Sequence, residues 1–473
     1  ESGGKTPYQH RDNQGSHDRL HAFSLLLWTV VTRAAYLQRG LPAHFTLLTL
    51  AVPMILANIT TPLLGLVDTA VMGHMAVSAP LAGAAIGGLI LTQIYWVCGF
   101  LRMSATGLSA QARGKQSSEE IAKTLYQTAF VGLAIGLLLL ILQQPVLWAG
   151  LTLTAPSEVV SGFAETYFNV RVWGAPAALS NIALIGWLVG QQKTRAVLFI
   201  QVVGNLLNAG LDLLFVWSFG MGVEGVALAS VIAEYTMVVM GLCVAIQHVD
   251  GVKPVWQWFS RSAQKVLMKL NGDMLLRNLA LQGCLAFLTI QGARYGETAT
   301  AVNAILMQFF VLIALGLDGI AYAVEATVGE AAGANSKQGV VIQTHRGLIW
   351  SSVVAIGYAL AFYGLGDNIV WMLTDINALQ TAAMPYLPLM VLLPLLAHWC
   401  FLFDGVFVGL TKAKSMRNTM IISALVVYFP VWFVLREAGN EALWWALLAF
   451  LLARGVTLGG SFYLYYVRAA DQG

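Results

Sequence analysis

The chain has 473 residues, of which 58% are hydrophobic and 10% are charged, against about 25% charged in soluble domains. This composition excludes a soluble globular protein and is typical of an integral membrane protein. The formal net charge of +3 is too small to indicate a nucleic-acid partner. All four cysteines lie in apolar runs without metal-ligand spacing, and we interpret them as buried apolar side chains: Cys98, Cys243, Cys284 and Cys400.

The N-terminal segment 1–40 differs from the rest of the chain. Glu1–Arg19 is polar, and the apolar run SLLLWTVV that follows is only eight residues long, too short to cross a bilayer. The sequence therefore predicts an N-terminal extension over 1–40 that is disordered or lies on the membrane surface.

The segment 45–73 is apolar and carries a single charge, Asp68. A helix of this length would extend about 43 Å, more than the hydrocarbon layer of about 30 Å. An ionised carboxylate inside it is costly, so Asp68 either has a partner or binds a proton. Pro53 and Pro62 each remove a backbone donor and favour a kink in this helix. The alternative is a structural Asp68 that bonds to a neighbouring polar side chain.

Further apolar segments follow with short breaks. The sequence predicts an all-α integral membrane protein with twelve transmembrane helices, at about 45–73, 80–108, 122–147, 159–190, 196–219, 223–247, 270–293, 302–332, 340–364, 379–410, 416–436 and 441–467.

The basic residues predict the orientation of these helices. With the N-terminus inside, 20 of the 26 Lys and Arg residues fall in cytoplasmic tails and loops, whereas the outer loops hold only Arg294 and Arg436. Such a bias predicts that both termini lie in the cytoplasm.

An internal repeat divides the chain. GQQKTR at 190–195 matches GLTKAK at 409–414, and AQARGKQS at 110–117 matches GEAAGANS at 329–336, both at the same offset of 219 along the chain. We therefore expect two six-helix lobes, 41–247 and 270–473, which form a parallel repeat and are joined by a cytoplasmic linker, 248–269. Repeated halves are common in transporters.

Polar residues of the first lobe are predicted to share a similar depth. Asn208 and Asp212 are four residues apart and share a helix face. Two carboxylates in a medium of low dielectric disfavour each other's ionised form, so Asp68 and Asp212 are candidates for proton coupling. The alternative is a network that only fixes helix packing. The remaining candidates for substrate binding or the hydrogen-bond network are Asn181, Asn205, Asn208 and Ser230.

The second lobe carries charges at other positions. Three are expected toward the cytoplasmic side and one nearer the middle, and the simplest interpretation is a structural ion cluster. Its members are Arg277, Asp318, Glu325 and Asp404.

Enzyme signatures do not occur in the sequence. It contains no Walker A loop, HExxH, CxxC or GxSxG. We therefore predict a protein that is not an enzyme, has no cofactor or metal, and takes its energy from an ion gradient.

Several of these segments resemble the MATE family of multidrug and toxin extrusion transporters, in particular its DinF branch. The resemblance covers about Leu41–Val467 and is carried by PLLGLVDTAVMGH, LRMSATGLSAQARG, VVGNLLNAGLDLLF, GVALASVIAEY, LDGIAYAVEATVGEAAGA and LFDGVFVGLTKAKSMRN.

The resemblance implies antiport of amphipathic or cationic organic compounds, with bending of the first helix as its Asp is protonated. It assigns the coupling carboxylate to Asp68 and the fifth-helix pair to Asn208 and Asp212. Sodium-type relatives use acidic residues of helices 7 and 10, and here helix 7 offers Arg277 instead.

The leading hypothesis is thus a monomeric, proton-coupled exporter of small drug-like compounds in the lipid bilayer. The alternatives are a sodium-coupled drug antiporter, a lipid flippase of the same superfamily, and, least favoured, a polytopic membrane enzyme.

Overall fold

The computed structural model describes residues 41–73 and 78–467, without the side chains of 41–42, 64–69 and 72–73. The predicted extension over 1–40 lies outside the described residues. The described residues from Leu47 onward form one compact unit. Within the described ranges the chain is helical and contains no strand.

The first lobe contains nine α-helices in the described ranges. They are α3 (Leu41–Gly73), α4 (Ala79–Val97), α5 (Phe100–Gly114), α6 (Ser118–Ile141), α7 (Gln143–Thr154), α8 (Glu158–Arg171), α9 (Ala175–Gly190), α10 (Thr194–Leu213) and α11 (Val223–Ile246).

The second lobe has the remaining eight described α-helices. They are α12 (Arg261–Arg294), α13 (Glu297–Gly333), α14 (Lys337–Leu373), α15 (Asn377–Ala383), α16 (Leu387–Gly409), α17 (Ala413–Ile422), α18 (Phe429–Leu435) and α19 (Asn440–Phe462).

Consecutive helices join into spans, and twelve spans in the described residues are long and apolar enough to cross a membrane. The prediction of an all-α protein with twelve transmembrane helices is therefore confirmed. α3 continues as one helix through Pro53 and Pro62. The predicted linker 248–269 ends in helix, because α12 already begins at Arg261.

Helix ends recur at the spacing of the repeat. α5 ends at Gly114 and α13 at Gly333, whereas α9 ends at Gly190 and α16 at Gly409. After α5 and after α13, a residue with positive φ and then a serine N-cap precede the next helix. The serines are Ser117 before α6 and Ser336 before α14, and each accepts a backbone N–H bond.

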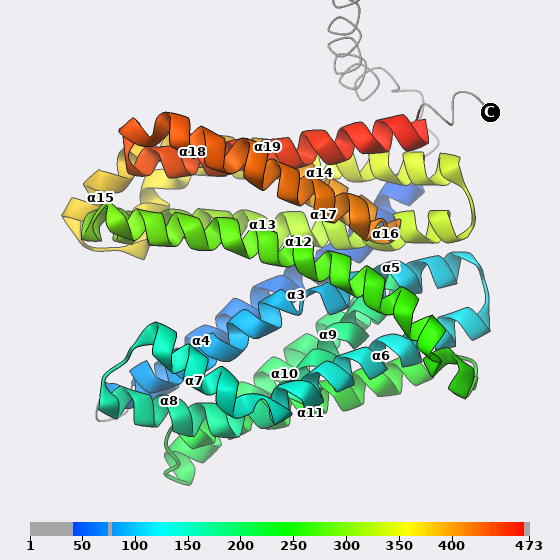
Figure 1. Ribbon diagram of the computed structural model, residues 1–473, viewed down its shortest axis with the longest axis horizontal. Helices are drawn as coiled ribbons and strands as arrows, with labels where there is room; N and C mark the ends of the chain where they lie inside the picture. Colours follow the sequence, from blue (N-terminus) through cyan, green and yellow to red (C-terminus); the bar gives the residue numbers. More distant parts are fainter. Residues whose placement is uncertain (1–40, 74–77, 468–473) are drawn as a thin grey trace, which may run out of the picture. The chain divides into compact units, whose positions relative to one another are not determined.

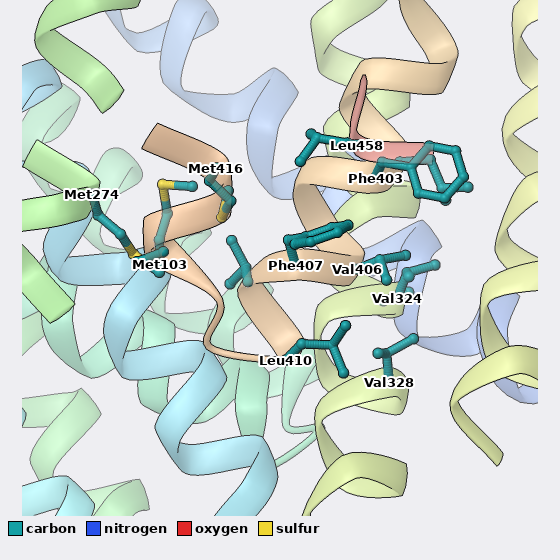
Figure 2. Packing of buried hydrophobic residues seen from close by; sticks show 14 of the residues in the cluster. Met103, Met274, Val324, Val328, Phe403, Val406, Phe407, Leu410, Met416 and Leu458 are labelled. Atoms are coloured by element: carbon teal, nitrogen blue, oxygen red, sulfur yellow. The ribbon is translucent and has the colours of Figure 1, made fainter. Parts of the chain in front are cut away.

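Figure 1 shows α4–α11 gathered on one side and α12–α19 on the other. Across this division α5 packs against α12, α13 and α16, and α9 packs against α13. The largest apolar cluster also crosses it: Figure 2 shows Met103 of α5 close to Met274 of α12 and Met416 of α17. Burial of these side chains stabilises the contact between the lobes.

Three of the four cysteines are buried, as predicted, but Cys243 is exposed. The prediction was wrong for Cys243 because a surface helix of a membrane protein is apolar on its outer face too.

Glycines form the tightest part of the contact between the lobes. A Cβ atom on Gly114 would lie less than 3.0 Å from the carbonyl oxygen of Glu330, and one on Gly333 less than 3.0 Å from that of Gln111. These two contacts are equivalent under the repeat, since Gln111 and Glu330 are separated by the same offset as the repeated motifs. We call the contact of α5 with α13 and α16 the glycine seam.

Hydrogen bonds and an ion pair also join the two lobes at the glycine seam. Gln111 donates from Nε2 to the backbone oxygen of Gly409 at 3.0 Å and to Oγ1 of Thr411 at 3.2 Å. In the equivalent position of the other half, Gln192 donates to Glu330. Arg113 also pairs with Glu330, at 3.3 Å. The lobes are thus joined at the ends of α5, α13 and α16.

Candidate functional site

The first lobe buries polar side chains where α9, α10 and α11 pack together. Asp212 is fully buried, Asn208 is 2% exposed, and Asn181 and Ser230 are 7% and 8% exposed. Oδ1 of Asn181 is buried and has no hydrogen-bond partner in the described part of the chain. A buried acceptor without a partner is costly and is often found at a functional site.

One face of α10 carries the predicted residues. Asn208 donates from Nδ2 to Oδ2 of Asp212 at 3.3 Å, one helical turn away. Asn205, a turn earlier, donates to Oγ1 of Thr60 on α3 at 3.0 Å. This face therefore reaches from the interior of the lobe to the first transmembrane helix.

The backbone of α3 is described through Gly73, but the side chain of Asp68 lies outside the described residues. Its role remains a prediction. α3 also reaches the second lobe, because Asn58 donates to the backbone oxygen of Leu315 on α13 at 3.3 Å.

The first lobe also contains a buried ion pair that was not part of the predicted site. Arg171 of α8 binds both carboxylate oxygens of Glu234 on α11, at 2.7 and 2.6 Å. Glu234 lies one turn after Ser230 on the same helix face, so the pair adjoins the polar interior. The sequence does hold a signal for this pair, since an arginine and a glutamate lie at matching depth in two of the predicted spans.

The second-lobe residues divide into two groups instead of one cluster. In the first, Asp404 of α16 accepts bonds from Arg277 of α12, at 2.6 Å, and from Arg454 of α19. Arg277 also donates to the side chain of Asn278 at 2.8 Å. Arg454, which was not among the predicted residues, completes this triad.

The second group lies between the lobes. Arg102 of α5 binds Glu325 of α13 through two bonds, at 2.8 and 3.2 Å, and its side chain is 18% exposed. The guanidinium also lies 4.2 Å from the ring centre of Tyr322. Glu325 thus pairs with the first lobe and not with Arg277, because its face of α13 points toward α5.

Asp318 lies two turns before Glu325 on α13 and is half-buried. Asp318 forms no hydrogen bond or ion pair with another described residue, although Arg102 attracts its charge and Glu325 repels it.

Metal ligands do not cluster in the described part of the chain, where no group of three or more His, Cys, Asp or Glu could hold an ion. His398 is buried, and its Nδ1 lies 2.9 Å from the backbone oxygen of Leu395.

The family model MatE matches residues 53–214 and 274–434, one match in each lobe. The chain belongs to the MatE family. The resemblance to the MATE family is therefore confirmed.

Individual proteins also match most of the chain. DNA damage-inducible protein F of Escherichia coli (strain K12) is 40% identical, over 86% of this chain and 90% of that protein. A probable multidrug resistance protein NorM of Deinococcus radiodurans is 27% identical, over 89% and 95% respectively.

A solved structure described as the outward-facing conformation of a multidrug resistance MATE family transporter has a TM-score of 0.78. It is 17% identical and covers 90% of this chain and 96% of its own. At this identity the likeness concerns the fold alone.

Proposed function

We propose that this MatE-family chain exports amphipathic or cationic organic compounds across the bacterial inner membrane in exchange for protons. Export of drug-like compounds is supported by membership of the MatE family and by relatives whose names state multidrug resistance. Proton coupling is supported by the fully buried Asp212, to which Asn208 donates a hydrogen bond. Both residues lie on the face of α10 that also bonds to α3. A buried carboxylate in a membrane span is a proton-binding candidate.

The register of α3 and α10 supports Asp68 as the second coupling carboxylate. Thr60 and Asn205 bond to each other, and both helices run outward if spans alternate in direction. Asp68 follows Thr60 by eight residues and Asp212 follows Asn205 by seven, about 12 and 10.5 Å along the two axes. Similar heights would let protonation of Asp68 alter the packing of α3 against α10.

The orientation follows from the charge bias, which puts both termini inside. The ends of α5, α13 and α16, which meet in the glycine seam, would then lie on the cytoplasmic side. In that orientation the described state is closed to the cytoplasm, and export would require the seam to open.

Sodium coupling through the second lobe is disfavoured by the environment of Asp404. Two arginines occupy this carboxylate, and a cation would have to displace both. A lipid flippase is disfavoured as well, since Arg102, a cation between the lobes, is already neutralised by Glu325. A phosphate headgroup would need a cation without such a partner.

Reconstituted protein would test the proposal. In proteoliposomes with an imposed pH gradient and no sodium, we expect ethidium to move against the proton flux. Ethidium transport that appears only after sodium is added would overturn proton coupling. Flipping of a fluorescent phospholipid without ethidium transport would favour the flippase instead.

A further inference from the structure

A cavity of about 310 Å³ lies between the first transmembrane helix and the start of α10. Thr49 and Leu50 of α3 line one side of it, and residues 192–196 line the other. Its volume is at the lower end of the range of about 300–1,000 Å³ that is typical of ligand sites.

The register of the two helices agrees with this position. Thr60 of α3 and Asn205 of α10 bond to each other, and Thr49 and Thr194 each come eleven residues earlier. Because eleven helical residues rise about 16.5 Å, two helices that run in the same direction bring Thr49 and Thr194 to one level. The cavity therefore lies at the end of α10 that the charge bias assigns to the cytoplasm.

Positive charge gathers at the cavity. Lys193 and Arg195 line it, and none of the other lining residues is acidic. Neither side chain forms an ion pair with another described residue. An anion in the cavity would therefore meet two cations that no carboxylate neutralises.

The start of α10 adds hydrogen-bond donors at the same place. Thr194, Arg195 and Ala196 are the first three residues of the helix, so their N–H groups have no partner within it. All three residues line the cavity, and Lys193, the N-cap, forms no side-chain cap bond. The positive end of the helix dipole thus adds to the charge of the two basic side chains.

The hydroxyl of Thr194 is a further donor that the protein itself does not use. Thr194 is 1% exposed and lines the cavity, and its Oγ1 forms no hydrogen bond with another described residue. The buried Thr128 and Thr344 donate to the backbone oxygen four residues earlier, whereas Thr194 is the first residue of its helix and has no preceding turn. A hydroxyl in so buried a residue normally has a partner, and an anion in the cavity would supply one.

Apolar surface continues from the cavity along both helices. On α3, Thr49 is followed at spacings of three and four by Val52 and Leu56, each 48% exposed. On α10, Phe199 lies one turn after Arg195 and is 63% exposed. Lipid chains are as apolar as such side chains and cover them in a membrane. A ligand that combines a phosphate with acyl chains therefore fits this surface better than free phosphate does.

We propose that the cavity binds the phosphate of an anionic phospholipid from the cytoplasmic leaflet, with the acyl chains along α3 and α10. Basic pockets between transmembrane helices on this side bind such headgroups in other proteins. The phosphate accepts bonds from Lys193, Arg195 and the hydroxyl of Thr194. Gln192 lines the cavity and also donates to Glu330 in the glycine seam, so the bound lipid lies beside the contact between the lobes.

The test measures how chain-labelled fluorescent phosphatidylglycerol binds to the full chain in a non-ionic detergent. Lys193→Gln/Arg195→Gln should weaken binding roughly ten- to thirtyfold, the value of two basic residues near an anionic headgroup. Phosphatidylcholine with the same label should bind weakly to both proteins, since its headgroup carries no net charge. Thr194→Val should also weaken phosphatidylglycerol binding, and it should not lower the melting temperature because the hydroxyl has no partner in the described protein.

The matched control is Lys412→Gln/Lys414→Gln. These exposed lysines occupy the equivalent positions of the repeat, and their removal changes the net charge by the same amount. Ala413 stands at the position equivalent to Thr194, so this part of the second lobe lacks the hydroxyl. We expect the control variant to bind phosphatidylglycerol like the wild type.

Three outcomes would overturn the proposal. The first is equal binding of phosphatidylglycerol by the wild type and Lys193→Gln/Arg195→Gln. An equal loss in the control variant would reduce the effect to general surface charge, and displacement of the lipid by an equal concentration of inorganic phosphate would assign the cavity to a free anion. None of these measurements involves transport, so their outcome is independent of the proposed function.

Discussion

Alanine at position 333 would test whether the glycine seam controls which side of the protein is open. A Cβ atom there would lie 2.7 Å from both the Cα and the carbonyl carbon of Gln111, and closer still to its oxygen. Carbon atoms in contact are normally about 3.5–4.0 Å apart. By this difference, α5 and α13 would have to separate by roughly 1 Å at this point.

The cost of this overlap falls only on the state in which the lobes touch. Inserting a methyl group into a well-packed contact costs about 1–3 kcal/mol, which changes an equilibrium by about 5- to 150-fold. Once the lobes separate the clash disappears. We therefore expect Gly333→Ala to shift the population toward the seam-open state and to slow export.

Spin labels at Glu119 of α6 and Gln338 of α14 would report the shift. Both side chains are exposed, and they are equivalent under the repeat. The distribution of distances between the two labels, measured by pulsed electron paramagnetic resonance, should gain a longer component in Gly333→Ala. Gly357→Ala on α14 is the control, since nothing lies within 4 Å of its added Cβ. An unchanged distribution in a well-folded Gly333→Ala protein would refute the reasoning.

Two further predictions concern stability and topology. Glu325→Gln should lower the free energy of unfolding by about 3–5 kcal/mol because it leaves the Arg102 charge without its partner. The double variant Arg102→Met/Glu325→Leu should recover most of the loss, and a Glu325→Gln protein that melts like the wild type would contradict the prediction. Single cysteines at the exposed positions Ser78 and Ser157 should react with an impermeant thiol reagent from outside, and one at Ser336 should not; the reverse pattern would exclude the proposed orientation.

Local and periodic features of this chain were predictable from the sequence. Each span needs only a long apolar stretch, and the Asn208–Asp212 contact needs only a spacing of four residues on one helix. The offset of the repeat also reappears in the ends of α5 and α13. These features depend on neighbours in the chain and not on how helices rotate against one another.

Pairing between helices was not predictable in the same way. Arg102 and Glu325 are 223 residues apart, and their contact depends on the rotation of both α5 and α13 about their axes. Grouping Glu325 with Arg277 by depth alone ignored that rotation. The repeat held a usable signal, because Arg102 corresponds to position 321, one turn from Glu325, and equivalent helices next to the axis of a repeat contact each other.

The central claim is that proton coupling depends on Asp68. The most direct measurement is ethidium efflux by Asp68→Asn protein in proteoliposomes at a fixed proton gradient, with Asp212→Asn for comparison and Asp367→Asn as control. Because asparagine resembles a permanently protonated aspartate, we predict that Asp68→Asn protein folds and inserts but fails to export ethidium at any pH. Efflux close to that of the wild type would contradict the account and would leave Asp68 a structural residue.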